Sequence, residues 1–121
     1  MATENLGKMV SFTAGEDLST KQFYPVKIHT NGTIKLAADT DAVVGILQEA
    51  GITEGNVGGV MISGISKFRS NDTLTPGEVV MPGTSGMVTA TTGKKVIGIV
   101  LESANAGELG SILFIQPSII A

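Results

Sequence analysis

The sequence repeats Val43-Val44-Gly45-Ile46-Leu47-Gln48-Glu49-Ala50 as Val96-Ile97-Gly98-Ile99-Val100-Leu101-Glu102-Ser103 in the second half of the chain. Shorter matches flank this stretch in the same order: Leu18-Ser19-Thr20 with Leu74-Thr75-Pro76, Asn31-Gly32-Thr33 with Ser85-Gly86-Met87, and Glu54-Gly55-Asn56-Val57-Gly58 with Gly107-Glu108-Leu109-Gly110. The matched residues are largely apolar residues and turn glycines. The repeat therefore predicts two copies of one supersecondary unit that bury a shared core, so that neither copy is stable alone.

Short β-type runs separated by turn residues fill most of the chain. They cover residues 23–28, 33–37, 43–48 and 60–65 in the first copy and 78–81, 87–90, 95–101 and 111–115 in the second. Gly and Thr interrupt every window long enough for a helix of three turns. Eight strands of this kind predict an all-β fold, a small β-barrel or β-sandwich built from two tandem structural repeats, and leave the strand pairing open. Asn31-Gly32 predicts a type I′ hairpin turn, in which both residues need positive φ.

Both ends of the chain differ from the repeated region. We expect residues 1–17 to form an extended N-terminal arm, because their apolar side chains follow neither a helical nor a strand period. We expect residues 18–121 to be a single β domain, with repeat one at about 18–70, repeat two at about 71–115 and an apolar tail at 116–121. Exposing Ile119 and Ile120 would cost about 1.5–3 kcal/mol each, so we expect both to be covered.

The composition argues against several classes of function. Apolar residues make up 42% of the chain, charged residues 16% and aromatic residues 4%, so the core must be mainly aliphatic and the surface carries few charges. The net charge of −3 predicts no nucleic-acid partner. Without cysteine there is no disulfide, thiolate nucleophile or cysteine zinc site. We expect no signal peptide and no membrane partner, since no apolar run approaches the ~20 residues of a membrane span.

His29 is the single histidine of the chain. A general base would need an orienting carboxylate and a nucleophile beside it, and nothing in the spacing of Asp39 and Asp41 requires either to be there. A solvated or hydrogen-bonded His29 is the favoured interpretation. The alternative functions are a small hydrolase with an inter-subunit site, based on His29 and scattered carboxylates, and a ligand-binding β module, which the few aromatic residues disfavour.

Glu49 and Glu102 occupy matching positions in the two copies. Paired carboxylates could hydrolyse a substrate or bind Ca²⁺, but their place at matching strand ends predicts that they face water or accept hydrogen bonds from loop amides. The glycine-rich segments 55–59 and 107–110 lack the remaining residues of a phosphate-binding loop and predict turns. We therefore predict no catalytic residue, no metal site and no cofactor, and a protein that is not an enzyme.

Four segments, taken in order, carry a resemblance to a known family. They are Thr13-Ala14-Gly15-Glu16-Asp17-Leu18-Ser19, Val43-Val44-Gly45-Ile46 with Glu49, Gly77-Glu78-Val79-Val80, and Ile97-Gly98-Ile99-Val100-Leu101-Glu102. Together, over about residues 12–115, they resemble the small capsid decoration proteins of tailed bacteriophages, also called cement proteins. The resemblance implies a β-rich, commonly trimeric protein that binds the outside of the expanded head at threefold and quasi-threefold positions and clamps the capsid subunits, without catalytic residues.

The resemblance also implies partners and a location. The expected partners are the major capsid protein and further copies of the chain in a homotrimer, and the expected location is the outer surface of the virion capsid after synthesis in the host cytoplasm. We hypothesise that the arm binds the capsid, ordering there as an added strand, through its apolar residues Leu6, Met9, Val10 and Phe12. A second hypothesis places Ile119 and Ile120 in the trimer interface.

Overall fold

The computed structural model describes residues 8–37, 41–83, 86–89 and 95–119. These residues form ten β-strands and no helix, which confirms the all-β prediction. The strands of the first half are β1 (Met9–Thr13), β2 (Pro25–Ile28), β3 (Ile34–Leu36), β4 (Gly45–Leu47) and β5 (Val57–Met61). Those of the second half are β6 (Ile65–Arg69), β7 (Val79–Gly83), β8 (Gly86–Thr89), β9 (Lys95–Glu102) and β10 (Leu109–Ile119).

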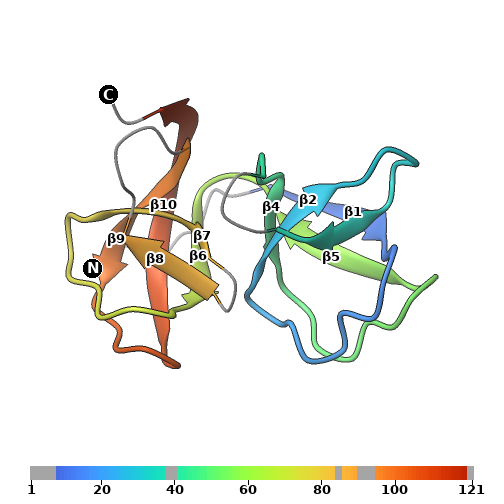
Figure 1. The fold of residues 1–121 in the computed structure, drawn as a ribbon, viewed down its shortest axis with the longest axis horizontal. Helices are drawn as coiled ribbons and strands as arrows, with labels where there is room; N and C mark the ends of the chain where they lie inside the picture. Colours follow the sequence, from blue (N-terminus) through green and yellow to red (C-terminus); the bar gives the residue numbers. More distant parts are fainter. Residues whose placement is uncertain (1–7, 38–40, 84–85, 90–94, 120–121) are drawn as a thin grey trace.

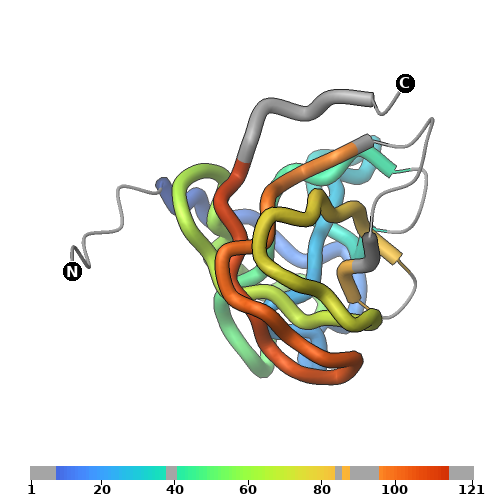
Figure 2. The backbone as a smooth tube through the Cα atoms, turned by 90° about the vertical axis from the view of Figure 1, so that its left-hand side faces the viewer, coloured from blue at the N-terminus to red at the C-terminus, as the bar shows by residue number. Residues whose placement is uncertain are grey.

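The two halves have the same topology. The first sheet has the strand order β1-β5-β4-β2-β3, and the second has β6-β10-β9-β7-β8, which is the same order with each strand replaced by its repeat counterpart. We call residues 8–61 the first lobe and residues 65–119 the second lobe. The lobes lie side by side (Figure 1), and one lies behind the other when the molecule is seen from the side of the second lobe (Figure 2). The predicted tandem repeat is therefore confirmed.

Neither sheet closes into a barrel. Among the described residues, the ends of the two edge strands of each sheet meet at an isolated parallel bridge, Ala14 with Ile34 in the first lobe and Ser70 with Met87 in the second. All strand pairs within the sheets are antiparallel. Each lobe is thus a strongly curved sheet that does not close. Of the two architectures that the sequence allows, the fold is sandwich-like and not a closed barrel.

Two strands were not expected from the sequence. Residues 9–13 of the expected arm instead form β1, which pairs with β5 from Met9 opposite Met61 to Thr13 opposite Val57. Residues 65–69 form β6 and belong to the second sheet, so the boundary between the repeats falls at residues 62–64 rather than near residue 70. The sequence does not predict β1, because the three consecutive residues Met9, Val10 and Ser11 are all exposed on an edge strand and give no alternating pattern.

The core consists of one cluster for each lobe rather than a single shared core. The first-lobe cluster contains Ala14, Leu18, Val26, Ile34, Leu47, Ile52 and Val60. The second-lobe cluster contains Phe68, Leu74, Val80, Met87, Ile97, Val100 and Ile112, together with Ile46 from the first lobe. Ile46 is therefore the first-lobe residue that is fully buried in the core of the second lobe, and the partly buried Phe23 and Val43 pack against the same cluster.

The Asn31-Gly32 turn differs from the predicted type I′ turn. Among these two residues only Gly32 has positive φ, at 87°. The loop spans residues 29–33, and the backbone amide of His29 donates to the carbonyl oxygen of Thr33 at 2.7 Å. The Asn31 side-chain oxygen accepts from the amide of Thr33 at 3.2 Å and from its hydroxyl at 2.6 Å. The longer loop needs only one residue in the left-handed region, which Gly32 supplies.

Candidate interaction surface

The matched carboxylates have structural roles. The Glu49 carboxylate accepts a hydrogen bond from the backbone amide of Gly59 at 2.6 Å, and Glu102 accepts one from the hydroxyl of Ser111 at 2.6 Å. Gly59 and Ser111 are themselves counterparts, on β5 and β10. Each carboxylate thus accepts a hydrogen bond from the neighbouring strand, and both glutamates are exposed to water, as the sequence predicts. Among the described residues, no three His, Asp or Glu side chains gather where they could hold a metal ion.

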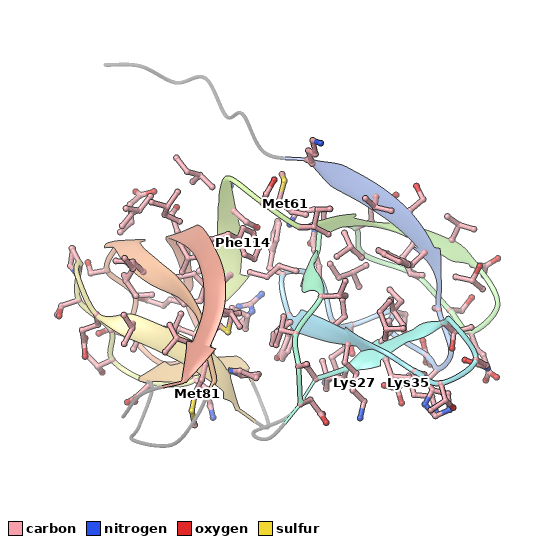
Figure 3. The ribbon with its side chains drawn as sticks, turned by 90° about the horizontal axis from the view of Figure 1, so that it is seen from above. Lys27, Lys35, Met61, Met81 and Phe114 are labelled. Atoms are coloured by element: carbon pink, nitrogen blue, oxygen red, sulfur yellow. The ribbon has the colours of Figure 1, made fainter. Side chains whose placement is uncertain are left out.

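His29 lies in the connection between β2 and β3 and is half-buried. The ion pair near this hairpin joins the Lys27 ammonium to the Asp41 carboxylate at 3.2 Å, while Lys27 lies opposite Lys35 across the strand pair (Figure 3). Asp39 lies outside the described residues. Partly exposed ion pairs of this kind contribute little to stability.

A row of apolar side chains crosses the outer face of the first lobe. Pro25 lies opposite Ile46, and Ile46 lies opposite Met61, on the neighbouring strands β2, β4 and β5. All three are buried, and Ile46 is 0% exposed. We call Pro25, Ile46 and Met61 the first-lobe row. Outward-facing residues of an open sheet are covered to this extent only when another element packs on them, and here that element is the second lobe.

The second lobe covers the first-lobe row with its edge strand β6, which contacts β4. The Gln48 side-chain amide donates to the Ser66 hydroxyl at 2.9 Å, and the Arg69 backbone amide donates to the carbonyl oxygen of Phe23 at 2.8 Å. A cleft of about 410 Å³ remains beside these contacts, lined by Phe23, Gln48, Met61, Ile65, Ser66, Lys67 and Ser111. Figure 3 shows Met61 and Phe114 near the place where the lobes meet. We call this contact the lobe junction.

Phe23 holds an unusual backbone conformation at the junction. Its φ is 67°, and among the described residues it is the one non-glycine residue with positive φ. Its counterpart is Gly77, with φ 93°, and the two turns match closely: the Phe23 amide donates to the carbonyl of Leu47 at 2.7 Å and the Gly77 amide to that of Val100 at 2.9 Å. The left-handed region costs a residue with a side chain about 1–2 kcal/mol. Phe23 packs against the cluster that contains Ile46, which offsets this cost.

Removing the Phe23 ring should leave the remaining backbone strain measurable. We expect both Phe23→Ala and Phe23→Gly to be less stable than the natural protein, and Phe23→Gly to be more stable than Phe23→Ala by about 1 kcal/mol, because alanine keeps a Cβ in the left-handed region. Urea unfolding followed by circular dichroism measures both. An alanine variant at least as stable as the glycine variant would contradict this account, since glycine is ordinarily the less stable residue in sheet proteins.

The corresponding row of the second lobe is open. Val79 lies opposite Ile99, and Ile99 lies opposite Leu113, on β7, β9 and β10. Val79 and Ile99 are half-buried, Leu113 is 40% exposed, and Leu101, two residues from Ile99, is 41% exposed. We call Val79, Ile99 and Leu113 the second-lobe row. Contiguous apolar side chains on the outside of a sheet are typical of interaction surfaces.

The residues singled out in the sequence fall into different environments. Met9 and Val10 are 53% and 39% exposed on β1, whereas Phe12 is half-buried against the first-lobe cluster. These three residues belong to the edge strand of the first sheet rather than to an unpaired arm. Their contact with the capsid stays a prediction. Leu6 and Ile120 lie outside the described residues, and the backbone of Ile119 pairs with Lys95 at the end of β10.

Comparison with known proteins identifies a structural neighbour. No protein-family model matches the sequence, and no curated protein matches it. The fold is similar to the crystal structure of the head fiber gp8.5 N base of bacteriophage phi29, with a TM-score of 0.67 and 13% sequence identity, over 96% of this chain and 100% of that chain. The described residues include no helix that could span a membrane.

Proposed function

We propose that this protein is a structural component of a tailed-phage head, bound to the outside of the capsid, and not an enzyme. The observation that carries the proposal is the likeness of nearly the whole chain to the whole N base of a phage head fiber. The resemblance of its sequence segments to capsid decoration proteins points to the same location. The exposed apolar residues of and beside the second-lobe row are consistent with binding to another protein.

In this proposal the protein is a homotrimer that binds the major capsid protein at threefold and quasi-threefold positions of the expanded head. A protein that binds only the expanded lattice stabilises it by RT ln(1 + [L]/Kd) at each site, where [L] is its free concentration and Kd its dissociation constant. The effect is summed over many sites on one shell. A trimer adds avidity, because the first bound copy holds the other two near their own sites.

The test is co-sedimentation of the purified protein with expanded heads of its source phage that were prepared without it. Unexpanded procapsids are the matched control. We expect saturable binding to expanded heads alone, at three copies for each threefold site. Absence of binding to both particles would overturn the proposed function, and equal binding to both would exclude a role confined to the expanded lattice.

A truncated chain in the same experiment tests the arm. Deleting residues 2–12 would remove most of β1, so loss of binding by that variant would have no clear meaning. Deleting residues 2–7 removes Leu6 and leaves β1 complete. If the arm binds the capsid, this variant should no longer sediment with expanded heads while its circular dichroism spectrum is unchanged.

The head-fiber neighbour favours a second version of the function. The solved structure is the N base of a head fiber, and this chain would then be the part of a fiber that lies against the head. Electron microscopy of decorated heads distinguishes the two versions. A decoration protein would appear as a low-lying feature at the threefold positions, whereas a fiber base would carry a projecting stalk.

A further inference from the structure

We infer that β1 of one copy of this chain binds the second-lobe row of another copy, in the way that β6 binds the first-lobe row within each chain. The inference deepens the homotrimer of the proposed function by assigning its contact to a surface. In the shared topology, β1 is the counterpart of β6, and β9 is the counterpart of β4.

The lobe junction joins two different surfaces. The first lobe contributes its outer row on β2, β4 and β5, and the second lobe contributes its edge strand β6. A contact between unlike surfaces leaves one of each unused, here the row of the second lobe and the edge strand β1 of the first. Contacts of this head-to-tail kind repeat between identical units and form closed rings or filaments.

The exposure of matched residues shows which surfaces are unused. Ile46 is 0% exposed and Met61 is buried, whereas their counterparts Ile99 and Leu113 are half-buried and 40% exposed. On the opposite surface, Ser66 is 4% exposed and its β1 counterpart Val10 is 39% exposed. The counterpart of each of these positions is thus more exposed than the position buried at the lobe junction.

At two matched positions, both side chains are polar at the lobe junction and both are apolar on the open surfaces. At the lobe junction, the Gln48 side-chain amide donates to the Ser66 hydroxyl at 2.9 Å. The counterpart of Gln48 is Leu101, and the counterpart of Ser66 is Val10. A polar pair inside the chain therefore corresponds to an apolar pair on the two open surfaces. If β1 of a second copy lies on the second-lobe row, Val10 and Leu101 meet and remove each other from water.

The charges of the two edge strands also differ. β6 carries Lys67 and Arg69, whereas no residue of β1 is charged. Natural edge strands that stay in solvent are commonly protected by charged residues. An uncharged edge with exposed Met9 and Val10 is suited to being covered, and the second-lobe row, itself without charge, leaves no buried charge unpaired.

The occupant we assign is a second copy of this chain, because the element that covers the equivalent row is already known to be a strand of this chain. In a closed homotrimer, three junctions would lie within chains and three between them. In this assignment Met9 and Val10 bind another copy of the chain instead of the capsid.

Sedimentation velocity of the purified full-length protein tests the contact. We expect the natural protein to sediment as a multiple of 12.4 kDa. Val10→Lys and Leu101→Glu should each raise the dissociation constant of self-association about tenfold or more, because each would place an unpaired charge in the contact between copies. The double variant should recover association beyond either single variant, since the two new charges meet between copies.

Val57→Lys is the matched control. Val57 is an exposed apolar residue at the other end of the β1–β5 pair, opposite Thr13, and its substitution should leave self-association unchanged. A natural protein that is monomeric at all concentrations would overturn the inference, as would single variants that associate normally or a double variant without recovery. Circular dichroism verifies the fold, and if Val10→Lys does not fold, Leu101→Glu decides alone.

The experiments distinguish failure of the contact between copies from failure of the proposed binding to the head. A Val10→Lys monomer that still sediments with expanded heads would leave the proposed function intact and remove only the need for self-association. A protein that self-associates through these surfaces but binds no head would support the contact and overturn the proposed function.

Discussion

Replacing Ile46 with alanine should lower the free energy of unfolding by about 2–5 kcal/mol. The side chain is 0% exposed and belongs to the second-lobe cluster although β4 is a strand of the first lobe. Its truncation leaves a cavity at a place where the first lobe completes the core of the second. The loss should therefore include both the transfer of the removed methyl groups and the contact between the lobes.

The measurement is urea unfolding followed by circular dichroism, with Ile28→Ala as the control. Ile28 lies on β2 of the same sheet but is exposed, so its truncation should cost less than about 1 kcal/mol. Equal losses at the two positions would mean that the lobe junction does not contribute to stability. Hydrogen exchange that becomes faster in both lobes of Ile46→Ala would show that the lobes support one another.

Replacing Gly45 with alanine should cost about 3 kcal/mol or more. A Cβ built at this position would lie 2.2 Å from the carbonyl oxygen of Met61 and 2.7 Å from a methyl carbon of Val60. The first of these neighbours is backbone on the paired strand β5, so it cannot move aside without breaking the pairing of β4 with β5. Overpacking of this kind destabilises by about 1–3 kcal/mol and occasionally more.

Gly51→Ala separates this clash from ordinary effects of losing a glycine. Gly51 has φ +79° and no neighbour within 4 Å of a built Cβ, so alanine there should cost only the left-handed conformation, about 1–2 kcal/mol. Thermal unfolding of both variants gives the comparison. If Gly45→Ala were no less stable than Gly51→Ala, the close approach of β4 and β5 would not explain why glycine occupies this position.

The duplicated β architecture could be predicted from the sequence because it depends on features that repeat. Gly45 and Gly98 stand at matching close approaches of neighbouring strands, 2.2 Å and 2.9 Å from the nearest backbone oxygen to a built Cβ. Such positions admit only glycine in both copies, so the match is visible in the sequence. β1 could not be predicted, because its residues Met9 to Ser11 are all exposed. No alternation of buried and exposed positions therefore appears in its sequence.

The interaction surface was harder to predict, for a physical reason. Leu101 and Leu113 are apolar residues of strands, and such residues ordinarily indicate core positions; nothing in either residue alone shows that it faces outward. What indicates the surface is the change of residue type between matched positions of the two copies: Gln48 corresponds to Leu101, and Ser66 corresponds to Val10. The strand register is needed to match these positions, and the burial of the side chains is needed to tell which member of each pair is covered.

The separation of the two sheets along the chain has a consequence for synthesis. All strand pairs of the first sheet lie within residues 9–61, so this sheet can be completed before β6 leaves the ribosome. At that moment Ile46 and Met61 still face water, because the strand that covers them has not yet been made. The nascent chain therefore carries an open apolar face for as long as translation takes to deliver β6, and a pause in that interval would prolong its exposure to other nascent chains.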